Sequence, residues 1–237
     1  MTSADNYRSQ WEASYEQGDN NILYPQVEVI RFLNRYVCKR DSNNSVTQIL
    51  NTYNNRPTRG LDFACGVGTH CITFTDFGID AYGVDISLNA LKIAQANASK
   101  RDISADRFIE LDASKQVLPF EDNFFDFVVA ESCLDSMPMD VAKQYITELK
   151  RVCSGLIYVS LIGKDDDMTA DEFVVTTKHE EGTYQAIFDE EKIAELFGAK
   201  SKDFIYYSLM NYVDVTLNKV QSARYYCVIE SQKIHSI

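Results

Sequence analysis

The middle of the chain, residues 60–163, alternates short apolar runs with amphipathic segments. Runs such as LDFA, DAYGVD and FFDFVVAES have the length and composition of buried strands, whereas SLNALKIAQANASK and MDVAKQYITELKRVC have the apolar spacing of helices. This alternation is typical of βαβ units, so we predict an α/β fold with a doubly wound, seven-stranded mixed sheet, helices on both faces and an antiparallel strand near the end. The loops that follow the parallel strands then share one edge of the sheet, where such folds bind ligands.

The two flanking segments show other patterns. Apolar residues at helical spacing predict an amphipathic helix over residues 25–38, after a lead that contains Tyr7, Trp11 and Tyr15. The Asn-rich stretch 40–59 predicts a surface loop with one helical turn around residues 47–50. The elements expected after residue 163 are an acidic loop, a hairpin over 172–188, a helix over 189–197 and strands around 204–210 and 224–231.

Composition restricts the partners of the protein. The 237 residues are 45% hydrophobic, enough for one sizeable core, and 23 basic side chains against 35 acidic ones give a formal net charge of −12. A surface this acidic repels phosphate backbones, so we expect no nucleic-acid partner. No run approaches the roughly 18 apolar residues that span a bilayer, and residues 1–10 lack a signal-peptide core, so we expect a cytoplasmic protein with no membrane span. The six cysteines form no CxxC pair and only three histidines accompany them, so no metal site is predicted.

The strongest local signal is GLDFACGVGTH, residues 60–70, a buried strand that opens into a glycine turn and a helix. Gly66 and Gly68 allow the backbone to approach a ligand closely. A dinucleotide fingerprint GxGxxG that began at Gly66 would need a third glycine where the chain has Cys71, so a pyrophosphate ligand is disfavoured. Asp62 inside this strand favours a cationic ligand, and Asp85, which ends the next strand, stands where a ribose-binding carboxylate is expected.

LDFACGVGTH resembles the first motif of class I S-adenosylmethionine (SAM)-dependent methyltransferases, with Ala64 in place of the motif's first glycine. The other landmarks of that family follow in order. They are Asp85 after the second strand, Leu111-Asp112-Ala113 where the family contacts adenine, and FEDNFFDFVVAESCLDSM at the fourth strand. The resemblance covers residues 60–163 and implies a Rossmann-like fold with SAM as the cofactor.

The resemblance also implies roles for individual residues. Asp85 would accept hydrogen bonds from both ribose hydroxyls, an arrangement that stabilises by roughly 2 to 3 kcal/mol, and Ile86 would pack on the adenine. The residues expected to contact the cofactor are Tyr24, Asp62, Ala64, Gly66, Gly68, Thr69, Asp85, Ile86, Asp112, Ala113, Glu131 and Ser132. We expect a single methyltransferase domain over residues 1–237, with a helical cap or lid (1–55), a SAM-binding core (56–163) and a hairpin and final strands that cover the acceptor (164–237).

The aromatic residues of the N-terminal lead have two interpretations. Trp11 and its neighbouring tyrosines could form a lid whose rings attract the sulfonium, since cation–π contacts contribute about 0.5 to 2 kcal/mol. They could equally anchor the N-terminal segment to the core. The sequence does not decide between these roles.

Methyl transfer from a sulfonium requires alignment of the reacting atoms and exclusion of water, and a base is useful when the acceptor is a hydroxyl. His179 lies after the fifth strand, in the region that covers acceptor sites in this family, so it is the candidate catalytic base. Asp135, Glu181 and Tyr184 are the candidate substrate-binding residues.

A small hydroxylated acceptor, a sugar or polysaccharide precursor, is the expected substrate. The lead W-x3-Y followed by Tyr24-Pro25 is similar to methyltransferases encoded among surface-polysaccharide genes. Two alternatives stay open: N-methylation of a small amine, and a SAM-binding partner protein without catalysis. A magnesium-dependent reaction is not expected, because Glu131 and Ser132 occupy the strand end at which catechol-type enzymes place a metal ligand. Nothing in the sequence indicates the oligomeric state.

Overall fold

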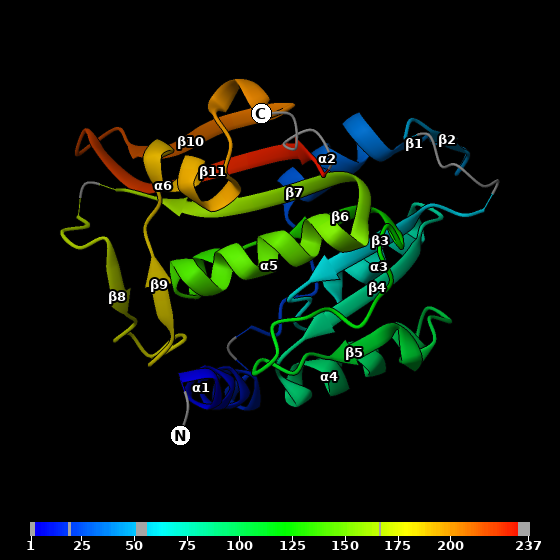
Figure 1. Cartoon of the computed structure of the whole chain (residues 1–237), viewed down its shortest axis with the longest axis horizontal. Coiled ribbons are helices and arrows are strands. Elements are labelled where there is room, and N and C mark those ends of the chain that lie inside the picture. Colours follow the sequence, from blue (N-terminus) through cyan, green and yellow to red (C-terminus); the bar gives the residue numbers. More distant parts are fainter. Residues whose placement is uncertain (1–2, 19, 51–55, 166, 232–237) are drawn as a thin grey trace.

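A computed structural model describes residues 3–18, 20–50, 56–165 and 167–231. Its centre is a seven-stranded sheet in the order β10–β11–β7–β6–β3–β4–β5 (Figure 1). Its strands, in chain order, are β3 (Arg59–Phe63), β4 (Asp80–Asp85), β5 (Phe108–Glu110), β6 (Phe125–Ala130), β7 (Cys153–Gly163), β10 (Tyr206–Asp214) and β11 (Lys219–Glu230). Strands β3 to β7 are parallel, and β11 is antiparallel to both of its neighbours. The predicted doubly wound mixed sheet is therefore confirmed.

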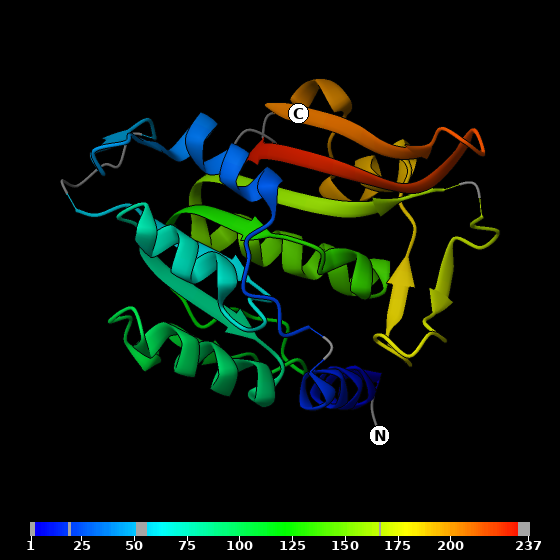
Figure 2. The same ribbon diagram turned by 180° about the vertical axis from the view of Figure 1, so that it is seen from behind.

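Helices cover both faces of this sheet. One face carries α5 (Met139–Val152) and α6 (Glu190–Phe197), and the opposite face carries α2 (Val27–Phe32), α3 (Thr69–Asp76) and α4 (Leu88–Ser99), as Figure 1 and Figure 2 show. Strand β6 is buried at every position because alternate side chains point to opposite faces. Val128 and Ala130 join the core beside α5, whereas Phe127 and Val129 join the core beside α3.

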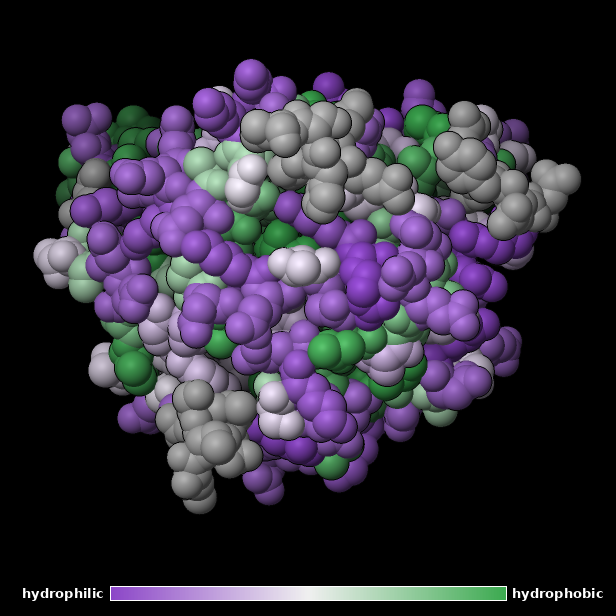
Figure 3. All heavy atoms as spheres, in the orientation of Figure 1, coloured by the Kyte–Doolittle hydropathy of each residue, from purple (hydrophilic) through white to green (hydrophobic). Residues whose placement is uncertain are grey.

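Helix α5 shows why the sequence pattern predicted these helices well. Its buried residues recur every three or four positions and are Ala142, Tyr145, Ile146, Leu149 and Val152. This spacing places them on one stripe that faces the sheet, while polar residues face outward. The face seen in Figure 3 is accordingly mostly hydrophilic, with apolar atoms in small groups. Among the described residues, no helix has both the length and the apolar character needed to cross a membrane.

Several elements lie outside the sheet and its covering helices. Helix α1 (Ser3–Gln17) lies next to α4, near the carboxyl ends of the parallel strands (Figure 1). A hairpin of β8 (Glu172–Val174) and β9 (Tyr184–Ala186) confirms the hairpin predicted for residues 172–188. Asp189 caps the first turn of α6, because its side chain accepts a hydrogen bond from the Lys192 N–H at 2.8 Å. The remaining short turns are η1 (Leu33–Val37), η2 (Ala105–Arg107), η3 (Leu134–Ser136) and η4 (Ser201–Asp203).

Two predicted elements differ in the structure. The helix expected over 25–38 is α2 followed by the π-helical turn η1, and it ends where β1 (Cys38–Arg40) begins. The helical turn expected around residues 47–50 is wrong, because β2 (Val46–Gln48) pairs with β1 in a hairpin. The turn between them is made by Asp41, whose carboxylate accepts from the N–H groups of Asn43 and Ser45 at 2.8 and 2.9 Å. Residues 51–55 of the expected loop lie outside the described residues.

Ala64, the residue in place of the motif's first glycine, has a φ of 58°, in the left-handed region. A side chain in this conformation destabilises the folded state by roughly 1 to 2 kcal/mol. Glycine removes this strain, but its greater freedom in the unfolded chain costs about 0.4 to 1 kcal/mol of stability. We therefore expect Ala64→Gly to raise the free energy of unfolding by about 0.5 kcal/mol in urea denaturation. As the matched control, Ala96→Gly in α4, at an exposed position, should lower it by about 1 kcal/mol. A destabilised Ala64→Gly protein would contradict this reading of the turn.

Candidate active site

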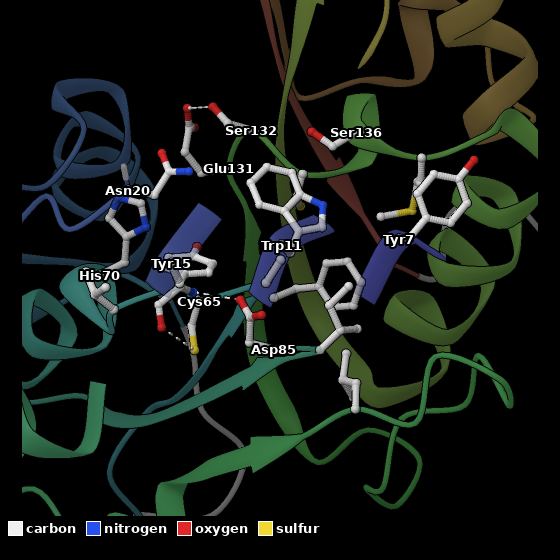
Figure 4. Close-up of a pocket in the computed structure, with 18 of the residues that line it drawn as sticks. Tyr7, Trp11, Tyr15, Asn20, Cys65, His70, Asp85, Glu131, Ser132 and Ser136 are labelled. Carbon is white, nitrogen blue, oxygen red and sulfur yellow. Dashed lines mark hydrogen bonds between the residues drawn. The ribbon is translucent and has the colours of Figure 1, made fainter. Parts of the chain in front are cut away.

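A cavity of about 290 Å³ opens at the carboxyl edge of the parallel strands, where the fold predicts a ligand site. Its floor is made by the residues that follow β3, β4 and β5, one wall by those that follow β6, and its roof by α1 (Figure 4). This volume is just below the range typical of small-molecule sites, which is roughly 300 to 1,000 Å³. The cavity therefore suits small ligands.

Asp85 lies at the foot of this cavity, at the end of β4. Its two carboxylate oxygens accept one backbone hydrogen bond each, from the Gly66 N–H at 2.9 Å and the Ser87 N–H at 2.8 Å. Burial raises the pKa of Asp85 to about 6 although these N–H groups favour its charged form. Each oxygen keeps a lone pair for a further donor. The predicted ribose-binding carboxylate thus faces the cavity with two acceptor positions left.

Gly66 is required at the turn above Asp85 for two reasons. Its φ is 52°, which glycine adopts without steric cost. A Cβ on Gly66 would also stand 2.6 Å from the hydroxyl of Tyr15, which comes from α1. The glycine turn and α1 therefore close on each other at this point. Gly68 also has a positive φ, of 80°, but it begins α3 and packs against Ala94, outside the cavity lining.

Helix α1 directs three aromatic side chains into the cavity. Tyr7, Trp11 and Tyr15 recur every fourth residue, so they share one face of the helix, and all three line the cavity (Figure 4). Burial, followed by the charge of Asp85, raises the pKa of the Tyr15 hydroxyl well above its usual value. The Tyr15 hydroxyl therefore stays protonated, and the three rings form an aromatic roof over the cavity. The lid interpretation requires this arrangement.

Another face of α1 anchors the helix to the rest of the molecule. The Glu12 carboxylate accepts from the Leu88 and Asn89 N–H groups, at 2.7 and 3.0 Å, and from the Ser87 hydroxyl at 2.9 Å. These donors belong to the first turn of α4, whose positive dipole end favours an anion. Arg8 adds an ion pair with Glu110. Glu12 and Arg8 thus supply the anchoring that the second interpretation assigned to the aromatic rings.

Glu12→Ala should release α1 without unfolding the sheet. Loss of a capping carboxylate costs about 1 to 2 kcal/mol, so the amide hydrogens of α1 should exchange roughly tenfold faster, measured by hydrogen–deuterium exchange. The control is Glu16→Ala, an exposed glutamate one turn further along α1, which should leave the exchange rates unchanged. Equal protection of α1 in both variants would show that Glu12 does not hold the helix.

Glu131 and Ser132 form the wall after β6 and are held by a hydrogen-bonded network. The Glu131 carboxylate accepts from the Tyr158 hydroxyl at 2.8 Å and from the Ser132 hydroxyl at 3.0 Å. Ser132 has a φ of 53°, and its N–H donates to Ser160 Oγ at 3.0 Å. Burial and the Glu131 charge raise the pKa of Tyr158, which keeps it a donor. The Glu131 carboxylate is thereby fixed in position at the edge of the cavity (Figure 4).

Asp135 was expected to contact the substrate, and the structure places it outside the cavity lining. The short turn η3 directs its carboxylate towards β7, where it accepts from the Ile162 N–H at 2.8 Å and faces Arg224 Nη1 at 3.4 Å. The residue is 1% exposed and does not line the cavity. Burial raises its pKa to about 6 against the effect of Arg224. Asp135 therefore acts as a buried structural carboxylate.

His179, the expected catalytic base, is likewise placed away from the cavity. Its side chain is 60% exposed and lies outside the cavity lining, in the loop between β8 and β9. Glu181 is exposed on the same loop, whereas Glu180, which has a φ of 58°, turns into the cavity. Tyr184 supports the roof instead of lining the cavity, since its ring stands edge-on to Tyr7 with centroids 6.3 Å apart.

Asp62 stands behind the cavity lining. Its carboxylate lies 3.5 Å from His70 Nδ1, and His70 itself lines the cavity. Burial disfavours charge on His70, but the Asp62 carboxylate raises its pKa overall. His70 Nε2 accepts from the Gln26 N–H at 3.4 Å, and the Thr69 hydroxyl donates to the Ile22 carbonyl at 2.5 Å. Sequence reasoning missed His70, and its only signal was its place directly after the glycine motif.

The other predicted cofactor residues divide into two groups. Asp112 lies outside the lining; its carboxylate makes a turn with Ser114 and Lys115, whose hydrogen bonds lower its pKa to about 2. The residues that do line the cavity are Tyr24, Ala64, Gly66, Thr69, Asp85, Ile86, Ala113, Glu131 and Ser132. Among the described residues, no group of three or more His, Cys, Asp or Glu side chains is placed to hold a metal ion.

Part of the chain is similar in sequence to known methyltransferases. Residues 61–156 match the family model of a methyltransferase domain. An uncharacterized protein of Haemophilus influenzae is 37% identical over 44% of this chain and 44% of its own length, and phosphoethanolamine N-methyltransferase 2 of Caenorhabditis elegans is 30% identical over 48% of this chain and 26% of its own length. The chain thus spans less than half the length of these curated relatives.

Solved structures extend the likeness to the whole fold. A SAM-dependent methyltransferase of Methanosarcina mazei superposes with a TM-score of 0.60 at 20% identity, over 75% of this chain and 94% of its own. The 1,6-didemethyltoxoflavin-N1-methyltransferase of Burkholderia thailandensis, solved with 1,6-didemethyltoxoflavin and S-adenosylhomocysteine, gives 0.63 at 15% identity over 96% and 88%. Residues 61–156 therefore match a methyltransferase-domain model, and the chain shares the Rossmann-like fold of these solved structures.

Proposed function

We propose that this chain transfers a methyl group from SAM to a small molecule. The observation that carries the proposal is the Asp85 carboxylate, which faces the cavity beneath the glycine turn and keeps two acceptor positions for the two hydroxyls of a ribose. Ile86 and Ala113 would hold the adenine beside it, and Glu131 would stand at the sulfonium end. These residues fit a cationic nucleoside better than a dinucleotide, because the turn offers no third glycine for a pyrophosphate.

The residues of this cavity would contribute alignment and exclusion of water. When bound, SAM supplies a methyl group activated by the sulfonium. Trp11 and Tyr15 cover the cavity from above and restrict water, while Glu131 is held by Tyr158 and Ser132 in one orientation. In this proposal, residues 1–55 would serve as the cap, 56–163 as the cofactor core and 164–237 as the cover of the acceptor.

The hydroxylated, sugar-like acceptor was expected from the N-terminal lead, and His179 was the base expected to deprotonate its hydroxyl. His179 lies outside the cavity. Any base that acts on the acceptor therefore has to be a group that lines the cavity, such as Glu131 or Glu180. A small organic acceptor remains the proposal for the class of substrate. The charge of the cavity bears on which acceptor atom receives the methyl group.

A calorimetric titration tests the proposed cofactor. SAM should bind the purified chain with a micromolar dissociation constant, whereas NADH should give no saturable heat, because the glycine turn does not fit a dinucleotide. Preferential binding of NADH, or no binding of SAM, would refute the proposed function.

The affinity for SAM should depend on pH through Asp85. The ribose hydroxyls need the ionised carboxylate as acceptor, and the pKa of Asp85 is raised to about 6. Affinity should therefore be constant above about pH 7 and fall below pH 6 by about tenfold per pH unit, as protonation competes with binding. Titrations between pH 5 and 8 should show this fall in the native protein and a flat profile in Asp85→Asn. The same slope in both proteins would assign the titration to another group.

A further inference from the structure

The cavity is lined by three carboxylates, whereas His70 is the one basic side chain among its described lining residues, and His179 Nε2 lies 3.8 Å from Glu180. Asp85, Glu131 and Glu180 line it, and among the described lining residues there is no lysine or arginine. SAM carries one net positive charge, so these carboxylates outnumber the charge that the cofactor brings. In Figure 4, Glu131 lies apart from Asp85, away from the predicted ribose position. A second ligand at that end would meet a negatively charged wall.

The basic groups closest to this wall are already neutralised. Arg224 donates from Nη1 to Ser132 Oγ at 3.0 Å, but the buried carboxylate of Asp135 lies 3.4 Å from the same atom. His70 faces Asp62 with one ring nitrogen and the Gln26 N–H with the other. Neither group is therefore placed to bind a phosphate in the cavity, since each is paired with a carboxylate.

The roof of the cavity favours a cation as well. Tyr7, Trp11 and Tyr15 line the cavity together with Asp85 and Glu131, and aromatic faces attract ammonium groups. The formal net charge of −12 adds a long-range attraction for cations and a repulsion of anions. Ring chemistry and charge thus favour the same class of ligand.

We infer that the acceptor is a small amine that enters as an ammonium cation next to Glu131 and Glu180, and not a phosphorylated or nucleotide-linked hydroxyl compound. This inference rests on the proposed function. The ammonium gives one proton to a cavity carboxylate, which passes it to water. The amine nitrogen then forms a bond to the methyl carbon while the carbon–sulfur bond breaks, and its electron pair stays on sulfur to leave a neutral thioether.

An amine suits these groups better than a hydroxyl. A carboxylate is a weak base, and an ammonium releases its proton far more readily than an alcohol does. The histidine that could have served an alcohol, His179, is outside the cavity, and both ring nitrogens of His70 have partners. The cavity therefore contains the groups needed to bind and deprotonate an ammonium, and it lacks a histidine poised to activate an alcohol.

Three probes with the same aromatic body separate the possibilities. Phenethylamine, phenethyl alcohol and phenethyl phosphate differ in charge, and each is titrated calorimetrically into the protein saturated with S-adenosylhomocysteine. The amine should bind at least tenfold tighter than the alcohol, and the phosphate should bind more weakly than either. Glu131→Gln and Glu180→Gln should each weaken the amine about tenfold and leave the alcohol unchanged. Glu181→Gln, the same change at the exposed neighbouring residue, should leave all three affinities as they are.

The inference is wrong if the amine binds no tighter than the alcohol, or if the phosphate binds as tightly as the amine. It is also wrong if Glu131→Gln and Glu180→Gln both leave the amine's affinity unchanged. Failure of S-adenosylhomocysteine to bind is seen in the first titration, before any probe is added, and would refute the proposed function instead.

Discussion

Asp85→Ala is expected to raise the dissociation constant for SAM by about 30- to 100-fold. The carboxylate would accept two charge-assisted hydrogen bonds from the ribose, together stabilising by about 2 to 3 kcal/mol, and each 1.4 kcal/mol is tenfold in affinity. Titration calorimetry at pH 8 measures the difference, because the carboxyl group is ionised there in the native protein. This variant has the largest expected effect on binding of any single residue in the cavity.

Two controls separate the loss of a ligand contact from a change in fold. Asp85→Asn keeps an acceptor for Ser87 or Gly66 and should weaken SAM less than alanine does. Asp80→Ala, at the other end of the same strand, removes ion pairs with Arg59 and Arg107 and should leave SAM affinity within about twofold. An Asp85→Ala protein that is folded and binds SAM like the native chain would refute the ribose site.

Asp135→Ala should lower the free energy of unfolding by about 3 kcal/mol. Removal of this carboxylate leaves the Ile162 N–H and the Arg224 guanidinium without their acceptor, and breaking a buried ion pair typically costs about 3 to 5 kcal/mol. The lower figure applies because Arg224 is 26% exposed. Urea denaturation followed by circular dichroism gives the change.

The control for Asp135 is Asp171→Ala. Asp171 has a 71% exposed side chain that lies 3.6 Å from Lys192, so its loss should change stability by less than about 0.5 kcal/mol. If Asp135→Ala proved as stable as this control and lost only acceptor binding, the expectation from the sequence would be restored. The outcome therefore decides between a structural carboxylate and a substrate-binding one.

The sequence predicted the sheet because its signals are long and repeated. The apolar stripe of α5 and the fully buried run of β6 each fix an element independently of its neighbours. The hairpin of β1 and β2 was missed because its strands have three residues each, too short for a periodic signal. Its turn depends on the Asp41 side chain and on Asn44 with a φ of 63°.

The candidate site was predictable where strand ends determine it. Asp85 and Glu131 follow β4 and β6, and parallel strands bring their carboxyl ends to one edge, so both line the cavity. The loop residues were not predictable in this way. A positive φ at Glu180 turns that residue into the cavity and leaves His179 outside. This backbone angle of one residue cannot be predicted from the pattern of side chains.

The roof of the site did have a signal in the sequence. Tyr7, Trp11 and Tyr15 are spaced by four residues, which places them on one face once the segment is helical. What the sequence could not show is that this face covers the cavity, because the anchor that positions it, Glu12 on the first turn of α4, joins residues more than seventy positions apart.

A crystal structure of the chain with S-adenosylhomocysteine tests the central claim most directly. We expect the ribose hydroxyls within hydrogen-bond distance of Asp85, the adenine against Ile86 and Ala113, and the sulfur on the Glu131 side beneath Trp11. A ligand bound elsewhere, or one whose ribose lies away from Asp85, would refute the proposed SAM site.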